Sequence, residues 1–255
     1  MLNEKIVFIT GASSGIGSSC AHYFAKAGAK LLLCARRLDV LNSLATQLQN
    51  EYEVEVHPFK LDVRDPLSVK ESLKALPSKW QKIDILINNA GLAAGLDTIQ
   101  EGRVEDWEAM IDTNIKGLLY VTREILPSMV ERNSGHVINI GSISGHQIYP
   151  KGAVYCATKH AVKALSNGLR QDLFGTKIRV SSVDPGAVIT NFSQVRFKGD
   201  EERAAAVYEG MEALTPNDVA DAVLYCASRP PHVNISELII MPTDQATVTM
   251  VARNK

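Results

Sequence analysis

The sequence predicts an α/β protein built on a Rossmann-like, doubly wound parallel sheet. Short apolar, β-branched runs alternate with longer amphipathic stretches, and a glycine-rich turn directly follows the first run. Strands that helices cover on both faces are apolar throughout instead of alternating. This order of strands and helices is typical of a doubly wound sheet. No repeat and no linker rich in Pro, Gly or Ser divides the sequence, so we expect a single domain over residues 1–255.

Seven segments have the composition of buried strands, and most stretches between them are expected to be helices. The predicted strands are 5–10, 30–35, 53–61, 83–88, 135–140, 177–184 and 236–241. Asp65 can cap a helix that begins at Pro66, and Thr215 followed by Pro216 predicts another helix start. Two long helices are expected over about 104–132 and 155–174.

The region 190–211 breaks this alternation of strands and helices. It carries Phe192, Arg196, Phe197 and a Lys198-Gly199-Asp200 turn, followed by a mixed helical stretch. Irregular segments of this length in a compact domain often cover a binding site. We expect a mobile, substrate-covering lid here and no second domain.

Charge and cysteine content favour a small-molecule ligand. The formal net charge of -1 provides no overall basic field for nucleic acid or anionic membranes. Cys20, Cys34, Cys156 and Cys226 show neither C-x-x-C spacing nor the density of a disulfide scaffold, so we expect reduced thiols, no metal site and a cytoplasmic protein. The sequence begins almost at once with an apolar strand and shows no basic leader or long apolar segment, so we expect no membrane insertion or export.

The turn from Thr10 to Gly17 lies between the first strand and a predicted helix over 18–27. Glycines let the backbone approach a pyrophosphate, and a helix N-terminus presents free N–H groups to that anion. A tight turn alone would explain the glycines, but the strand–turn–helix context matches a dinucleotide site. The predicted cofactor contacts in this turn are Gly11, Ser13, Ser14, Gly15, Ile16 and Gly17.

Arg36 and Arg37 follow the second strand, where many NAD enzymes carry an acidic residue that binds the ribose hydroxyls. Two cations at this place bind a 2′-phosphate through charge-assisted hydrogen bonds. The alternative is a solvated basic pair before a helix. The position favours the phosphate role, so we expect NADP as the cofactor.

Two further strand ends predict cofactor contacts. Asp62 and Val63 follow the third strand, where an adenine is expected, and the alternative is that Asp62 only caps a helix, a role that Asp65 already fills. Asn89, Ala90 and Gly91 follow the fourth strand, at the sheet edge where doubly wound folds bind ligands. A simple turn would explain Ala90 and Gly91 but explains two successive asparagines less readily.

Tyr155 and Lys159 are expected on one face of a helix, because their spacing is i,i+4. A phenol with a pKa near ~10 is a poor base at neutral pH, and lowering it by about three units requires roughly 4 kcal/mol of preferential phenolate stabilisation. A nearby ammonium group contributes to that stabilisation. Alone, the pair would be two ordinary residues of an amphipathic helix.

Ser142 and Asn114 complete the candidate set for chemistry. Ser142 follows the fifth strand, where its hydroxyl can orient a reacting oxygen, and Asn114 lies in a predicted helix bend, where it can hold a water on a proton path from Lys159. A turn serine and a bend asparagine are individually unremarkable. Together with Tyr155 and Lys159 they indicate acid/base catalysis.

These residues, in this order, resemble the short-chain dehydrogenase/reductase family over essentially the whole chain. The resemblance implies that Tyr155 is the acid/base, that Lys159 binds the nicotinamide ribose and tunes Tyr155, that Ser142 fixes the substrate oxygen and that Asn114 supports the relay. It also implies nicotinamide contacts from the segment after the sixth strand, namely Pro185, Gly186, Val188 and Thr190. A homotetramer built partly from the two long helices is implied as well.

A narrower likeness comes from the segments 195–200, 213–216, 232–235 and 241–242. They resemble the NADP-dependent 3-hydroxy acid dehydrogenases, which act on serine, allo-threonine or 3-hydroxypropionate and malonic semialdehyde. For such a substrate, Arg196 in the expected lid is the candidate carboxylate ligand, together with Ser142 and Tyr155 at the reacting oxygen. Lys198 is the nearby substitute, and the alternative is that both cations only keep the lid soluble.

Two other functions remain open at this stage. The same fold accommodates a reductase for a larger ketone, because loops decide the substrate. A non-catalytic NADP-binding sensor is the alternative of a different class, and the intact set of Asn114, Ser142, Tyr155 and Lys159 argues against it.

Overall fold

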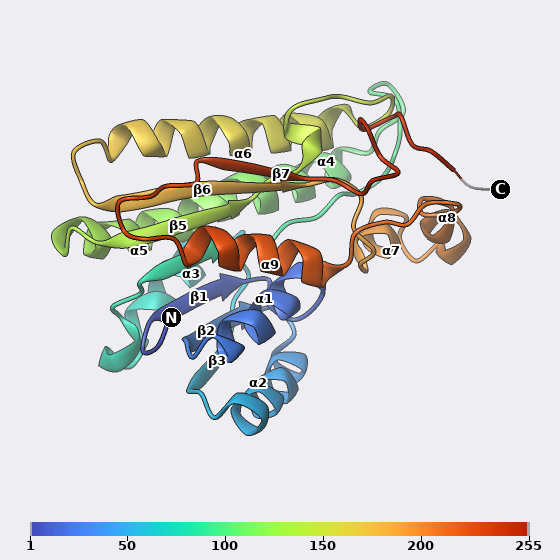
Figure 1. The fold of residues 1–255 in the computed structure, drawn as a ribbon. Coiled ribbons are helices and arrows are strands. Elements are labelled where there is room, and N and C mark those ends of the chain that lie inside the picture. Colours follow the sequence, from blue (N-terminus) through green and yellow to red (C-terminus); the bar gives the residue numbers. More distant parts are fainter. Residues whose placement is uncertain (1, 254–255) are drawn as a thin grey trace.

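A computed structural model describes residues 2–253 of the chain, and within them seven parallel strands form one sheet (Figure 1). The strand order is β3-β2-β1-β4-β5-β6-β7. The order runs outward in both directions from β1 and β4, as a doubly wound sheet requires, so the predicted fold class is confirmed. The strands are β1 (Ile6–Thr10), β2 (Lys30–Ala35), β3 (Val56–Lys60), β4 (Ile85–Asn88), β5 (Gly135–Ile140), β6 (Ile178–Pro185) and β7 (Glu237–Ile240).

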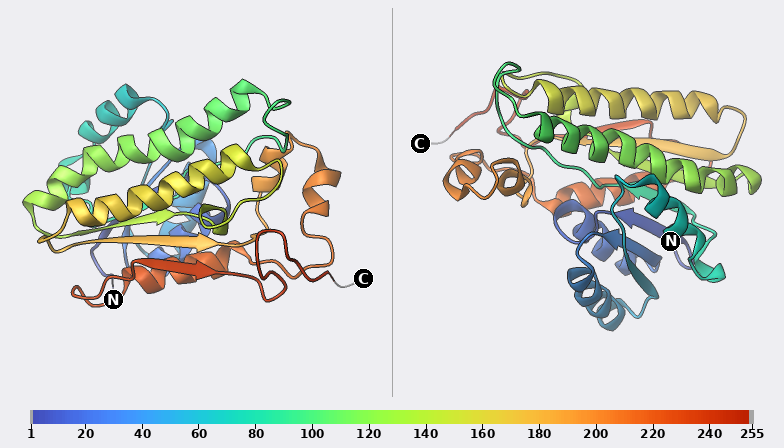
Figure 2. Two further views of the ribbon diagram at one scale, coloured as in Figure 1. Left: turned by 90° about the horizontal axis from the view of Figure 1, so that it is seen from above. Right: turned by 180° about the vertical axis from the view of Figure 1, so that it is seen from behind.

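Helices cover both faces of the sheet (Figure 2). One face packs against α1 (Gly15–Lys26), α2 (Leu38–Tyr52) and α9 (Pro216–Ala227), and the other against α3 (Pro66–Lys74), α5 (Leu118–Glu131) and α6 (Ala153–Asp172). Strand β1 shows why its sequence is apolar throughout. Its side chains alternate between two hydrophobic clusters, with Val7 in one and Phe8 in the other.

Both predicted helix starts are present. The Asp65 side chain accepts hydrogen bonds from the backbone N–H groups of Leu67 and Ser68 at the start of α3. Thr215 and Asp218 form a capping box at the start of α9. The predicted strand 53–61 begins later, at Val56, because Glu53 adopts a left-handed φ of 55° that ends α2.

The expected long helix over 104–132 is interrupted. It consists of α4 (Val104–Ile111), a π-helical turn η2 (Asp112–Gly117) and α5. A π-helical turn inside an α-helix often marks a functional site, and this one contains Asn114. Two short 3-10 segments complete the middle of the chain, η1 (Ser78–Trp80) and η3 (Ile143–Gly145).

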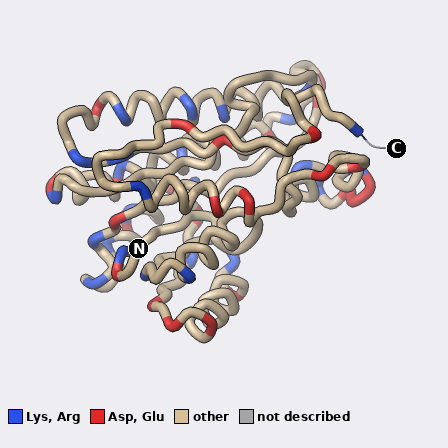
Figure 3. Tube along the Cα trace, in the orientation of Figure 1, with Lys and Arg blue, Asp and Glu red and all other residues tan. Residues whose placement is uncertain are grey.

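The segment 190–211 contains two short helices, α7 (Phe192–Arg196) and α8 (Glu201–Ala206). They lie apart from the sheet, beyond the carboxyl ends of the strands (Figure 1). Lys, Arg, Asp and Glu are interspersed along the chain, with acidic positions gathered on α8 (Figure 3). Within residues 2–253 no helix is both long and apolar enough to cross a membrane.

Candidate active site

A cavity of about 1310 Å³ opens at the carboxyl ends of the strands, between the sheet and the segment that holds α7 and α8. This volume exceeds the roughly 300–1,000 Å³ of an ordinary small-molecule site, so it has room for a dinucleotide together with a small substrate. Every predicted site residue lines the cavity except Gly17 and Asn114.

The glycine-rich turn is held in place by the loop after β4. Gly11 has a φ of 65° and approaches Ala90 so closely that an added Cβ would lie 2.9 Å from its Cα. The Asn89 side chain donates to the backbone oxygens of Thr10 (2.9 Å) and Gly11 (3.1 Å). Ser14 precedes α1 without a side-chain cap, so the first N–H groups of α1 are free to bind a phosphate.

Gly17, one of the predicted cofactor contacts, is placed differently from the others. It is buried in α1, where an added Cβ would lie 2.5 Å from the Asn89 amide nitrogen and 2.5 Å from the Gly11 oxygen. The absence of a side chain is therefore required for close packing of helix against turn, and Gly17 does not line the cavity. The Asn89 amide nitrogen also bonds within the protein, because it donates to two backbone oxygens of the turn.

Cations gather at the end of the cavity next to β2 and β3. The Arg37 guanidinium donates to the hydroxyls of Ser13 (3.1 Å) and Ser14 (3.3 Å), which brings it to the glycine-rich turn. Arg64, which the sequence reasoning did not select, binds the Asp62 carboxylate with two nitrogens and lowers its pKa. Asp62 is thus neutralised by a partner and does not repel an anion beside Arg37.

Tyr155 and Lys159 project from α6 into the cavity and are each 8% exposed. The Lys159 ammonium lies 6.0 Å from the centre of the Tyr155 ring and donates to the Ile140 oxygen at 2.9 Å. Burial lowers the pKa of Lys159 to about 8. Burial raises the pKa of Tyr155, and hydrogen bonding to Ser142 and the charge of Arg196 oppose that rise.

Ser142 is fixed at the start of η3. Its hydroxyl accepts a hydrogen bond from the Ser144 backbone N–H at 3.1 Å and caps this segment. The backbone before it is also constrained, because a Cβ at Gly141 would lie 1.8 Å from the Asp184 carboxylate. A rigid hydroxyl next to Tyr155 can orient an oxygen that exchanges a proton with the phenol.

Asn114 lies in η2 and does not itself line the cavity. Its amide nitrogen donates to the Leu92 oxygen (2.8 Å) and to the Thr158 hydroxyl (3.0 Å), and its oxygen accepts from the Leu92 N–H (2.9 Å). The side chain therefore ties the loop after β4 to α6, one residue before Lys159. An added Cβ at Gly91 would lie 3.3 Å from the Asn114 oxygen and 3.8 Å from the Lys159 nitrogen, so both groups border the same small space.

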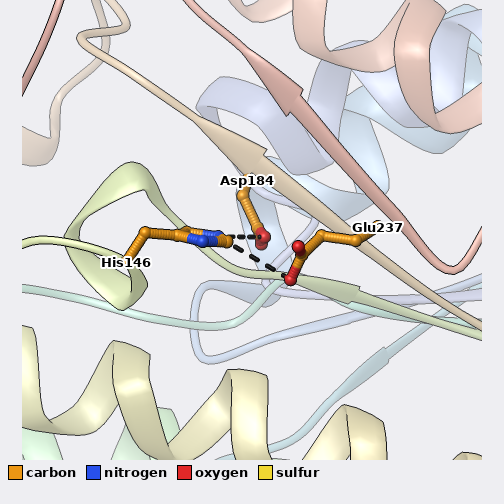
Figure 4. A group of neighbouring side chains, drawn as sticks. All are labelled: His146, Asp184 and Glu237. Carbon is orange, nitrogen blue, oxygen red and sulfur yellow. Dashed lines mark hydrogen bonds and ion pairs between the residues drawn. The ribbon is translucent and has the colours of Figure 1, made fainter.

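A polar cluster extends from the buried Asp184 through His146 to the exposed Glu237 (Figure 4). His146, Asp184 and Glu237 bring metal-ligand atom types within 4.8 Å of one another. However, the Lys163 ammonium lies 2.7 Å from His146 Nδ1, and His146 Nε2 lies 2.8 Å from Asp184. An ammonium can only donate, so Nδ1 accepts and Nε2 carries the proton toward Asp184. A cation already occupies this cluster, which fits a structural support better than a metal centre.

Arg196, the predicted carboxylate ligand, reaches the same space as Tyr155. Its Nε donates to the Gly95 oxygen at 3.0 Å, and its guanidinium lies over the rings of Tyr149 (5.4 Å) and Tyr155 (5.8 Å). Its Nη2 is buried without a hydrogen-bond partner in the structure. Lys198 instead pairs with Asp106 at 2.7 Å, so it is a poorer candidate. Tyr149 was not selected from the sequence, where no motif marks it.

Residues 5–201 match the family model described as short chain dehydrogenase, so the chain belongs to that family of oxidoreductases, which act on hydroxyl groups. Among its relatives is the NADP-dependent 3-hydroxy acid dehydrogenase YdfG of Salmonella typhimurium, which is 48% identical over 242 residues and covers 94% of this chain and 96% of the relative. The NADP-dependent 3-hydroxy acid dehydrogenase of Schizosaccharomyces pombe is 43% identical over 255 residues, 100% of this chain and 98% of the relative.

Two solved structures are similar throughout. The closed form of serine dehydrogenase complexed with NADP+ superimposes with a TM-score of 0.91 at 45% identity, covering 98% of this chain and all of the other. Serine dehydrogenase from Escherichia coli superimposes with a TM-score of 0.82 at 43% identity, covering 94% of this chain and 99% of the other. The recognised family resemblance is confirmed.

Proposed function

We propose that this protein is an NADP-dependent dehydrogenase of small 3-hydroxy acids. The observation that carries the substrate class is the buried Arg196 Nη2 without a hydrogen-bond partner, on a guanidinium that lies over the Tyr155 ring, because this group can hold a carboxylate near the carbon that gives up hydride. Two similar proteins are named NADP-dependent 3-hydroxy acid dehydrogenases, and a similar solved structure is a serine dehydrogenase complexed with NADP+, which supports the same function. The residues that line the cavity fit NADP, with α1 at the pyrophosphate and Arg36 and Arg37 at the 2′-phosphate.

The residues divide the reaction between them. NADP, when bound, accepts or returns the hydride. In the oxidative direction the Tyr155 phenolate takes the proton of the substrate hydroxyl, Ser142 holds the oxygen, and Lys159 stabilises the phenolate and binds the nicotinamide ribose. Asn114 supports the proton path at Lys159, while Pro185, Gly186, Val188 and Thr190 border the nicotinamide. Asp62, Val63, Ala90 and Gly91 border the rest of the cofactor.

The segment 190–211 is proposed to be the lid over this site, because Arg196 and α7 line the cavity opposite Tyr155. We further propose a homotetramer, supported by the exposed apolar side chains of Val104, Ile111, Leu119 and Val130 on the long interrupted helix. A cytoplasmic location is proposed because no disulfide joins the cysteines in the part of the chain described.

The direct test is a steady-state screen of 3-hydroxy acids against neutral alcohols with NADP and with NAD. We expect the highest kcat/KM for a 3-hydroxy acid with NADP. A clear preference for bulky neutral ketones would instead favour the larger-ketone reductase, and binding of NADP without turnover of any alcohol would favour a sensor.

Replacing Arg196 with Ala should lower the ratio of kcat/KM for serine or 3-hydroxypropionate to that for an uncharged alcohol of similar size. The expected change is about 10²-fold, equivalent to ~3 kcal/mol, because only the charged substrate loses a buried ionic hydrogen bond. The comparison belongs on the upper plateau of the pH profile, where Tyr155 is fully active. Equal losses for both substrates would show that Arg196 only shapes the lid.

Replacing Lys159 with Ala should move the rising limb of the pH profile to higher pH as well as lower the rate. The Lys159 pKa of about 8 means that its ammonium forms as pH falls below that value, and this cation favours the Tyr155 phenolate. Without it the phenolate forms only at higher pH. An unchanged pH profile of kcat/KM, measured alongside an unchanged melting temperature, would contradict this tuning.

A further inference from the structure

Two cations lie at nearly equal distances from the candidate acid/base. The Lys159 ammonium is 6.0 Å from the centre of the Tyr155 ring, and the Arg196 guanidinium carbon is 5.8 Å from it. Lys159 comes from α6, as Tyr155 does, whereas Arg196 comes from α7 in the segment that covers the cavity. The second cation therefore reaches Tyr155 only when that segment is docked.

Arg196 is held in this position by contacts that leave its charge free. Its backbone oxygen accepts from the Gly95 N–H at 3.0 Å, and its Nε donates to the Gly95 oxygen at 3.0 Å, so one residue fixes both its main chain and its side chain. The Tyr149 ring supports the guanidinium at 5.4 Å. Among the described residues no carboxylate forms a salt bridge with Arg196, and its Nη2 is buried and unpaired.

The surrounding groups do not cancel this charge. Tyr149 and Cys156 are uncharged at neutral pH because burial raises the pKa of each, and burial also raises the pKa of Tyr208. Two carboxylates, those of Asp97 and Asp106, border Gly95, which binds Arg196. Asp106 is paired with Lys198, and Asp97 is exposed to solvent, which screens it. The other facing charge is the Lys159 ammonium.

We propose that Arg196 is a second positioning cation for Tyr155, so that docking of the segment 190–211 activates the acid/base as well as covering the site. In oxidation, the substrate hydroxyl gives its proton to the Tyr155 phenolate while the carbon hydride passes to NADP, and a ketone or aldehyde forms. A guanidinium at 5.8 Å favours that phenolate before the proton moves. This role deepens the proposed function, since a substrate carboxylate on Arg196 would offset the same charge.

The expected size of the shift in the Tyr155 pKa follows from Coulomb's law. A unit charge at 5.8 Å shifts an ionisation by about 0.5 pH unit at the dielectric constant of water and by about 2 units at the effective value typical of protein sites. The direction agrees with the effect of Arg196 on the pKa of Tyr155, which it lowers against the influence of burial.

The test compares Arg196→Met, which removes the charge and keeps a long side chain, with Arg196→Lys, which keeps the charge. Arg203→Met is the matched control, because it removes a cation that lies on the same segment but is exposed, stacks on Phe197 and lies outside the cavity lining. The substrate is the uncharged analogue of 3-hydroxypropionate that has a hydroxymethyl group in place of the carboxylate. The readouts are the pH profile of kcat/KM and, without turnover, the ¹³Cζ NMR titration of Tyr155 in the NADP+ complex, assigned by its loss in Tyr155→Phe.

We expect Arg196→Met to move both the kinetic profile and the NMR titration to higher pH by about 0.5–2 units. Arg196→Lys should move them less, and Arg203→Met should leave them in place. Titrations of Arg196→Met that superimpose on the wild type, or an equal shift in Arg203→Met, would overturn the proposal.

The outcome for the substrate class is separate. A pH shift with an unchanged preference for charged substrates would support the second cation and contradict carboxylate binding by Arg196. Loss of that preference without a pH shift would support carboxylate binding by Arg196 and contradict its role as a second cation for Tyr155. Neither the assay with the uncharged analogue nor the NMR titration uses a 3-hydroxy acid. The test of the second cation therefore remains decisive even if 3-hydroxy acids are poor substrates.

Discussion

Tyr155→Phe is expected to abolish turnover while leaving NADPH binding almost intact. The substitution removes only the hydroxyl that exchanges a proton with the substrate oxygen, and loss of a positioned acid/base costs about 10²–10⁴-fold or more in rate. The ring itself should stay in place. It packs edge-on against Phe192 at 5.5 Å and lies under the cations of Lys159 and Arg196, contacts that a phenyl ring preserves.

The measurement pairs kcat in both directions with NADPH affinity from fluorescence titration. Tyr225→Phe is a suitable control, because Tyr225 is 46% exposed on α9 and lies outside the cavity lining. It should behave as the wild type in both assays. Turnover near the wild-type rate in Tyr155→Phe would refute the assignment of the acid/base, whereas loss of NADPH binding would indicate damage to the site.

Replacing Arg36 and Arg37 together with neutral residues should raise the KM for NADP far more than the KM for NAD. Each ionic contact to a 2′-phosphate contributes about 1.5–3 kcal/mol, which corresponds to roughly 10- to 150-fold per arginine. Arg37 is anchored to Ser13 and Ser14, so its cation is preorganised at the glycine-rich turn, where we propose that the ribose of a bound cofactor lies. NAD carries no such phosphate and loses little.

Lys60→Met separates a phosphate contact from the general charge of this region. Lys60 is an exposed cation at the end of β3 and lies outside the cavity lining, so this variant should alter the NADP to NAD preference less than the loss of Arg37. Both KM values follow from the same steady-state assay. If NADP and NAD weaken equally in the double variant, the two arginines do not recognise the 2′-phosphate.

The sequence by itself determined the features that depend on local pattern. All seven strands were predicted within a few residues. The clearest examples are β1 and β2, since a strand buried on both faces needs continuous apolar residues whatever its neighbours are. The Asp65 and Thr215 caps were predicted because a cap bonds to backbone groups two or three residues away. Tyr155 and Lys159 lie together because the helical repeat fixes the relation of residues four apart.

Only the tertiary structure decided how side chains from distant segments meet. Asn89 holds the glycine-rich turn across a separation of 79 residues, and Arg196 bonds to Gly95 across 101. No periodicity relates positions so far apart, so the packing role of Gly17, the pairing of Lys198 with Asp106 and the place of Tyr149 could not be derived from the sequence. Their physical basis is the folding of separate loops onto one sheet edge, where each polar group takes the partner that packing brings to it.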